Sequence, residues 1–293
     1  MIFGKVDNPE LVDFLLPPDH PDTIKVLTKS KKSATINISV GCAKWNRTDL
    51  KGFYPRGIKD ELTYYATRFN SIELNATFYS IPPINQVETW RDKTPDDFKF
   101  FPKITNSISH FKRLKDVGNL VDEYCSNISN FGDKLGMVFL QLHDNFSFKD
   151  FDRLKDFIEK FPQGIPLALE LRNSSWFNDF EISEQILYPF LEENKITNII
   201  VDTAGRRDLL HMHLTTPIAF VRYVGTNHPS DYTRLNDWVE RIKIWIDNGL
   251  ENLYFFIHQN IEKESPLLAT HFIKQFNEVC GLNVRGPESS GLF

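Results

Sequence analysis

Polar or charged side chains end seven of the eight apolar, strand-like runs of this chain. They are Glu73 with Asn75, Lys103, Gln141 with His143, Glu170 with Arg172, Asp202, Arg222, and His258 with Asn260. The first run ends instead in Gly41 and Cys42. A buried strand is usually a near-continuous hydrophobic run, so charges repeated at its carboxyl end call for an explanation. If the strands are parallel, these ends meet at one edge, and we predict a shared site there.

The mixture of acids and bases favours acid–base chemistry on an anionic ligand. Glu73 is the predicted general base. Guanidinium groups match carboxylate or phosphate, and a lysine adds a point charge, so the cations at the strand ends form a predicted anion clamp: Lys103, Arg172 and Arg222. Two catalytic carboxylates would orient these cations, Glu170 and Asp202. Three further side chains would contact the ligand: Asn75, Gln141 and His258.

Two other interpretations of the same residues stay open. A divalent metal could take oxygen and nitrogen ligands from separate strand ends, although three cations in the same place would oppose it. Its candidate ligands are Glu73, Glu170, Asp202, His143 and His258. Alternatively, the acids and bases only neutralise one another in a structural network, since an unpaired buried charge costs several kcal/mol. No other cofactor is predicted.

Histidines away from the strand ends carry weaker signals. His110 follows the third strand and could reach over the site as acid, base or ligand, whereas a plain surface position is the alternative. His211 and His213 form an H-x-H pattern, which is a weak metal signal. We expect that pair in an exposed loop.

Aromatic side chains just beyond strand ends could stack on a sugar ring or a base. They are Trp45, Tyr54, Tyr79 and Trp176. The alternative is that they pack the loops down over the strands. The predicted ligand is therefore a small anionic or ring-containing molecule. A net charge of −5 and a pI of about 5.9 disfavour a broad nucleic-acid-binding surface and leave a local basic pocket open.

The apolar runs alternate with segments of helical period. The expected strands are 36–42, 71–75, 98–103, 137–142, 165–171, 198–202, 218–223 and 253–258, and the expected helices are 59–69, 84–93, 116–131, 149–160, 182–193, 235–247 and 266–278. Such alternation predicts a parallel sheet, and its length suits a single (β/α)8 TIM-type barrel. A doubly wound open sheet is the alternative, but G-x-G-x-x-G and P-loop motifs are missing.

Side-chain parity assigns the polar strand ends to one face. Residues two apart in a strand share a face, so Glu73 and Asn75 should point one way and Ile72 and Leu74 the other. The same rule groups Glu170 with Arg172, Phe220 with Arg222, and Phe256 with His258. The polar face is the predicted barrel interior.

The bulk composition indicates a globular protein, either one barrel-sized domain or two ordinary ones, with reduced cysteines. The 293 residues are 41% hydrophobic and 25% charged, enough for a large core. Three cysteines show no disulfide or zinc spacing, and no apolar stretch reaches the roughly 18 residues of a membrane helix. We expect a cytoplasmic protein of unknown oligomeric state. Residues 1–34 are an expected extension because Pro17, Pro18 and Pro21 interrupt any helix; 35–280 are the barrel domain and 281–293 the tail.

Several segments resemble the YecE-like family, catalogued as domain of unknown function seventy-two. They read VGCAKW at 40–45, FYP at 53–55, ELTYYA at 61–66, FNSIELNATFY at 69–79 and SSGLF at 289–293. The resemblance implies a TIM barrel and no established reaction. That fold is similar to xylose-isomerase-like barrels, which include metal-dependent DNA-repair endonucleases and sugar isomerases. By this analogy a metal-dependent phosphoesterase is an alternative to the acid–base enzyme. A non-catalytic module that uses the same pocket to hold a metabolite or a nucleic-acid end is another.

Overall fold

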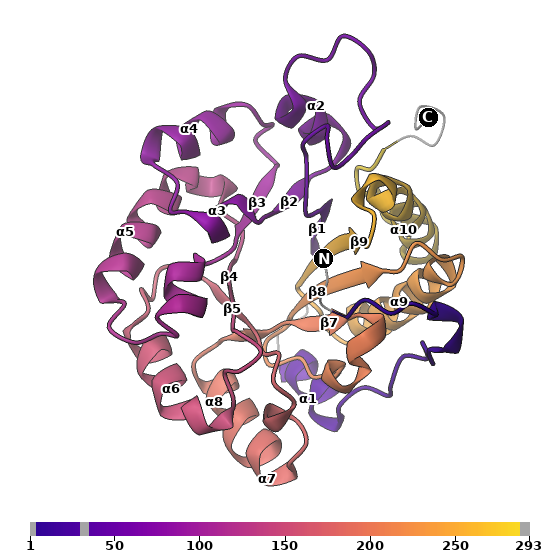
Figure 1. The fold of residues 1–293 in the computed structure, drawn as a ribbon. Helices are drawn as coiled ribbons and strands as arrows, with labels where there is room; N and C mark the ends of the chain where they lie inside the picture. Colours follow the sequence, from indigo (N-terminus) through magenta and orange to yellow (C-terminus); the bar gives the residue numbers. More distant parts are fainter. Residues whose placement is uncertain (1–3, 30–34, 288–293) are drawn as a thin grey trace.

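Parallel strands enclosed by helices form an α/β fold, as the sequence predicts (Figure 1). The computed structural model describes residues 4–29 and 35–287. The motif at 289–293 lies outside these residues. The strands are β1 (Asn37–Cys42), β2 (Ser71–Leu74), β3 (Lys99–Pro102), β4 (Val138–Gln141), β5 (Leu167–Glu170), β6 (Thr197–Asn198), β7 (Ile200–Asp202), β8 (Ile218–Gly225) and β9 (Asn252–Gln259). Each predicted strand is present, and the sixth is divided into β6 and β7.

The strands pair in parallel within three sheets. Their orders are β1-β9-β8-β7, β2-β3 and β4-β5-β6. The division at Ile199 arises because its N–H donates to Leu169 of β5, whereas Ile200 pairs with Val221 of β8. The described strands thus do not share one continuous ladder, and a closed eight-stranded barrel is not shown by their pairing.

Short contacts join neighbouring sheets. An isolated parallel bridge links Lys103, beyond β3, to Phe139 of β4. Between β1 and β2 the side chain of Asn70 accepts from the Val40 N–H at 2.9 Å and donates to the Ile38 carbonyl at 2.7 Å. The backbones come so close here that a Cβ on Gly41 would lie 2.1 Å from the Ser71 carbonyl oxygen, so only glycine fits.

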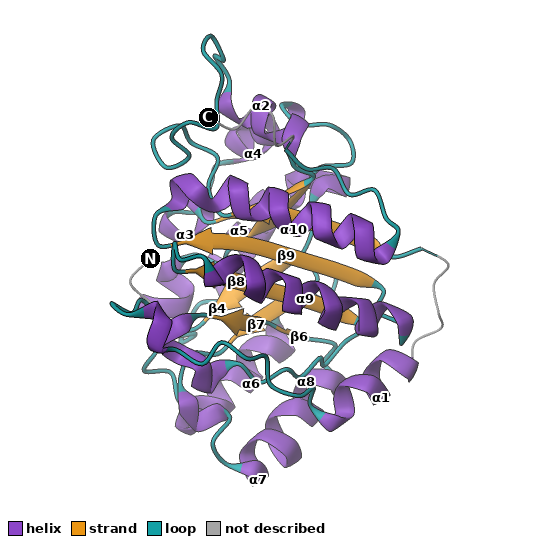
Figure 2. Ribbon diagram, turned by 90° about the vertical axis from the view of Figure 1, so that its right-hand side faces the viewer, coloured by secondary structure: helices purple, strands orange, loops and turns teal. Residues whose placement is uncertain are grey.

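Helices surround the strands, and α9 and α10 lie across β8 and β9 (Figure 2). The helices are α1 (Pro21–Lys29), α2 (Glu61–Arg68), α3 (Ala76–Tyr79), α4 (Ile84–Asp92), α5 (Gly118–Ile128), α6 (Phe151–Lys160), α7 (Phe180–Ile182), α8 (Tyr188–Glu193), α9 (Ser230–Asp247) and α10 (Ser265–Cys280). A π-helical turn, Ser183–Leu187, joins α7 to α8. Helix α9 starts earlier than expected because Asp231 accepts the N–H groups of Thr226 and His228 and closes the preceding turn.

Helix α1 contradicts the expectation that prolines exclude a helix from the N-terminal segment. Pro21 is the first residue of α1, where its missing N–H removes no hydrogen bond. Thr23, Val26 and Leu27 are buried. The N-terminal segment therefore packs on the body of the protein.

Two apolar clusters lie on opposite faces of the strands. Ile72, Leu74, Leu167 and Leu169 belong to the large cluster between strands and helices. A smaller cluster lies among the strands: Phe101, Met137, Phe139, Ala168, Ile199, Val201, Phe220 and Phe256. This alternation confirms the predicted parity. No helix in the described ranges has the length and apolar character needed to span a membrane.

Candidate functional site

Arg222 of β8 lies at the centre of a buried ion-pair network. Its Nε donates to Glu73 Oε2 at 2.8 Å and its Nη2 to Glu73 Oε1 at 2.7 Å. Its Nη1 donates to Glu170 Oε2. All three side chains are fully buried. The ends of β2 and β5 and the carboxyl-terminal half of β8 thus converge, as the parity of the sequence predicts.

A chain of hydrogen bonds extends this network to Lys103. Glu170 Oε1 accepts from Arg172 Nε at 2.6 Å and from Gln141 Nε2 at 2.8 Å. The amide oxygen of Gln141 in turn accepts from Lys103 Nζ at 2.7 Å. Gln141 therefore separates the lysine from the carboxylate.

The network keeps both glutamates ionised. Burial alone would raise the pKa of Glu170, but Arg222 and Arg172 lower it to about 2. Likewise, Arg222 and His258 outweigh burial and hold the pKa of Glu73 well below its usual range. The carboxylates of Glu170 and Glu73 raise the pKa of Arg222, although burial alone would lower it. Glu73 is thus a charged but weakly basic counter-ion.

Lys103 is in a different electrostatic situation. Burial and the nearby Arg222 charge lower the pKa of Lys103 to about 7. Among the described residues no carboxylate pairs with it directly, and its Nζ lies 4.0 Å from the centre of the Phe78 ring. At neutral pH a substantial fraction of this amine is uncharged, which suits it to proton transfer.

His258 of β9 offers a second proton-handling atom. Its Nε2 lies 3.0 Å from Glu73 Oε2 and 3.3 Å from Arg222 Nη2, so this nitrogen contacts both a carboxylate and a guanidinium group. No described residue makes a hydrogen bond with Nδ1, and Glu262 Oε1 lies 3.8 Å from it. A carboxylate that orients a histidine in this way is a common arrangement in acid–base catalysis.

A cavity of about 660 Å³ opens beside Lys103 and His258. Its walls include Asn75, Gln141 and the exposed ring of Tyr79. Its cationic lining side chains are Lys44, Lys51, Lys103, Arg172 and Lys263, against the two carboxylates Asp49 and Glu262. The excess of positive charge suits an anionic ligand. Arg222 is not among the lining residues, because Glu73 and Glu170 enclose it.

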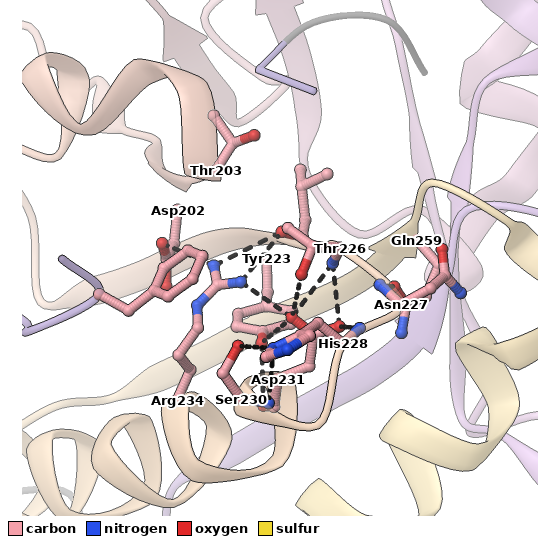
Figure 3. A network of polar contacts seen from close by, with 12 residues as sticks. Asp202, Thr203, Tyr223, Thr226, Asn227, His228, Ser230, Asp231, Arg234 and Gln259 are labelled. Atoms are coloured by element: carbon pink, nitrogen blue, oxygen red, sulfur yellow. Dashed lines mark hydrogen bonds and ion pairs between the residues drawn. The ribbon is translucent and has the colours of Figure 1, made fainter. Parts of the chain in front are cut away.

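Asp202 lies apart from this network, in contrast to its predicted role beside Glu73. Its neighbour Val201 belongs to the cluster among the strands, so Asp202 points to the opposite face. There it accepts from Arg234 Nη2 and Trp238 Nε1, both at 2.8 Å, and from Arg207. Figure 3 shows Arg234 among Asp202, Tyr223 and Asp231, which anchor the start of α9.

The predicted aromatic and histidine residues are divided between the cavity and the core. Tyr79 lines the cavity, and partly buried Trp45 lines an adjoining cavity of about 190 Å³ together with Glu73. Trp176 and Tyr54 are buried and bind loop carbonyls, so they pack loops. His110 is half-buried against Phe78, and burial together with Lys103 lowers its pKa to about 4.

Some cavity residues were not singled out from the sequence. Lys44 and Lys51 follow β1, and Glu262 and Lys263 follow β9. The only sequence feature that points to these residues as part of a site is their position after a strand. The loops after β1 and β9 meet because all six residues of β1 pair with β9.

The candidate metal ligands do not fit a metal at the strand ends. Arg222 donates to both Glu73 and Glu170, and Asp202 lies on another face with Arg234. A cation at this position would compete with the guanidinium group for the same oxygens.

The fold and the site define a class: a parallel α/β protein with a cation-lined cavity at the carboxyl ends of its strands. The chain belongs to the family described as protein of unknown function DUF72, whose model matches residues 39–289. This confirms the resemblance to YecE-like proteins.

Similar proteins agree with this membership. The chain is 26% identical to UPF0759 protein YecE of Escherichia coli (strain K12) over 253 residues, covering 79% of this chain and 89% of that protein. It is 29% identical to UPF0759 protein YunF of Bacillus subtilis (strain 168) over 150 residues, covering 48% and 52% of the two chains.

Two crystal structures of DUF72 family proteins have the same fold. The protein from Enterococcus faecalis V583 has a TM-score of 0.69 at 19% identity and covers 86% of this chain and 99% of that one. The protein from Thermotoga maritima MSB8 has a TM-score of 0.64 at 24% identity and covers 82% and 99%.

Proposed function

We propose that this protein is an enzyme that acts by acid–base chemistry on a small phosphorylated or carboxylated ligand held in the cavity. The observation that carries the proposal is the position of Lys103. Its amine lines a cavity with four other cations and is bonded to an amide oxygen instead of a carboxylate. An incoming anion would supply the missing charge partner.

Roles follow from the geometry. Arg172 and the rim lysines, Lys44, Lys51 and Lys263, bind the anion. Lys103 and His258 transfer protons, with Gln141 and Glu73 orienting them. Arg222 and Glu170 form the rigid base of the site. The sequence predicted Glu73 as the base. We assign proton transfer instead to Lys103 and His258, which line the cavity.

We also infer that the three sheets follow one another around a TIM-type barrel. Three observations support this arrangement: the Lys103–Phe139 bridge, the Asn70 contacts between β1 and β2, and the apolar cluster among the strands. The cavity would then occupy the carboxyl-terminal mouth, where barrel enzymes have their active sites.

Ligand-induced thermal stabilisation tests the anion site. Inorganic phosphate, citrate, sugar phosphates and a 5′-phosphorylated oligonucleotide would be screened against the wild type, Lys103→Met, Arg172→Ala and the surface control Lys155→Met. We expect at least one anion to raise the melting temperature of the wild type and of the control only. Equal stabilisation of all four proteins would contradict the proposal.

Turnover separates an enzyme from a binding module. Each stabilising compound would be incubated with the protein and followed by mass spectrometry. We expect product with the wild type, and binding without product in His258→Gln. Tight binding with no turnover of any compound would favour the non-catalytic alternative.

A further inference from the structure

A second cluster of polar side chains lies away from the cavity, where the N-terminal segment meets the chain before β8. It consists of His20, Glu184 and His213, and their ligating atoms all lie within 4.8 Å of one another. His20 directly precedes α1, Glu184 lies in the π-helical turn, and His213 belongs to the segment between Asp202 and β8. Three distant parts of the sequence thus meet at one point.

The ring of His213 is buried without a hydrogen-bond partner among the described residues. Its side chain is 1% exposed, and neither ring nitrogen makes a hydrogen bond with any described residue. The sequence expectation of an exposed H-x-H loop is therefore wrong for this residue. A buried polar group left unsatisfied costs about 1–3 kcal/mol, so such a group calls for an unseen partner such as a water or an ion.

Carboxylates converge on the two imidazoles. Glu184 Oε2 lies 2.7 Å from His20 Nε2, and Glu192 Oε1 lies 3.5 Å from His213 Nε2. The ring centres of His20 and His213 are 4.0 Å apart. Ser183 Oγ lies 3.2 Å from the other oxygen of Glu184, Oε1, and 3.1 Å from the Asp179 carbonyl oxygen.

The two members of the H-x-H pair have different roles. Both ring nitrogens of His211 contact the backbone. Its Nε2 lies 3.1 Å from the Ile199 carbonyl oxygen, and its Nδ1 accepts from the His213 N–H at 3.1 Å. These bonds fix the backbone that presents His213.

We propose that His20, Glu184 and His213 bind a divalent transition metal of the zinc class, with Glu192 in reach as a fourth ligand. Two imidazoles with one or two carboxylates are a typical zinc donor set, and bond lengths of about 2.0–2.2 Å require the two ring centres, 4.0 Å apart here, to separate. Coordination through His20 Nε2 places a proton on Nδ1. This nitrogen can then no longer accept the 3.2 Å hydrogen bond from the Asp22 N–H. The metal would fasten the N-terminal segment to α8.

The backbone around the site is already held in place. The Met212 carbonyl accepts from the His20 N–H at 3.2 Å and from Thr23 Oγ1 at 3.0 Å, and the Leu214 N–H donates to the same hydroxyl at 3.1 Å. Two of the ligands therefore stay together without the metal. Such preorganisation favours a defined site over loose surface binding.

Zinc and cobalt titrations of the full chain, stripped with a chelator, test the proposal. We expect one equivalent of Zn²⁺, visible absorption of tetrahedral Co²⁺ and a higher melting temperature with metal. His20→Ala and Glu184→Gln, which alter partly exposed residues, should lower the Zn²⁺ affinity by at least about tenfold, because even residues that only orient a ligand contribute that much.

Two controls make the result decisive. His271→Ala removes a histidine on α10 outside the site, and Lys103→Met alters the cavity; both should bind Zn²⁺ like the wild type. The proposal is overturned by the lack of saturable binding, or by His20→Ala and Glu184→Gln variants that fold and bind as tightly as the wild type. Its outcome is independent of the anion screen.

Discussion

Arg222 holds Glu73 through two parallel hydrogen bonds, Nε to Oε2 at 2.8 Å and Nη2 to Oε1 at 2.7 Å. Both side chains are fully buried. This bidentate pair joins the end of β2 to the carboxyl-terminal half of β8, across the space enclosed by the strands. It is the rigid base against which Lys103 and His258 face the cavity.

Removing Arg222 should destabilise the protein strongly. Arg222→Met leaves Glu73 and Glu170 buried without their main counter-charge, so we expect a loss of about 3–5 kcal/mol in the free energy of unfolding. Urea denaturation measures this loss. Arg153→Met, at a partly exposed ion pair, should cost at most about 1 kcal/mol. Similar losses in both variants would contradict the central position of Arg222.

Acid should weaken the network through Glu170. Its pKa is lowered from 4.5 to about 2, because Arg222 and Arg172 outweigh the effect of burial. A carboxyl whose folded pKa is depressed stabilises the fold above its unfolded pKa, and this contribution is lost as the pH falls toward 2. Urea midpoints between pH 6 and about 3 should therefore fall less steeply in Glu170→Gln than in the wild type. Parallel pH profiles would refute this assignment.

Lys103 should have the opposite pH dependence. Burial and Arg222 lower its pKa from 10.5 to about 7, so the charged amine opposes folding below pH 7. This penalty is relieved as the pH rises from 7 toward 10.5. Lys103→Met should thus be more stable than the wild type at pH 6, by an amount on the order of a few kcal/mol, and the difference should shrink by pH 10. If the stability difference between the two proteins stayed constant across this range, the pKa of Lys103 would be that of an ordinary lysine.

Asp202 should matter for stability and not for the ligand. Asp202→Asn weakens its contacts with Arg234 and Trp238, so we expect a loss of about 3 kcal/mol in unfolding free energy. Anion-induced stabilisation should remain that of the wild type, because Asp202 does not line the cavity. If Asp202→Asn abolished anion binding in a folded protein, the two networks would be coupled.

Local sequence pattern predicted the strands and the convergence of Glu73, Glu170 and Arg222, because the period of two in a strand dictates which side chains share a face. The same rule separates Asp202 from Val201, but it does not say which of the two faces inward; the structure places Val201 there. The prediction for Asp202 was wrong because it rested only on the polar residue at the end of the sixth strand.

Long-range contacts were beyond the reach of the sequence. His213 follows a polar-looking stretch and was expected to be exposed, but α1 and Tyr188 cover it. Lys44 and Lys263 are some two hundred residues apart, and only the pairing of β1 with β9 brings their loops to one cavity. Such contacts depend on tertiary packing, which local periodicity does not encode.

The titration of Lys103 tests the central claim most directly. The side-chain resonance of this lysine would be assigned by comparison with Lys103→Met and followed by NMR against pH, with and without saturating inorganic phosphate or citrate. We expect a midpoint near 7 in the free protein and a clear upward shift with an anion, because a negative charge in the cavity stabilises the ammonium form. A midpoint near 10.5 that no anion changes would contradict the account.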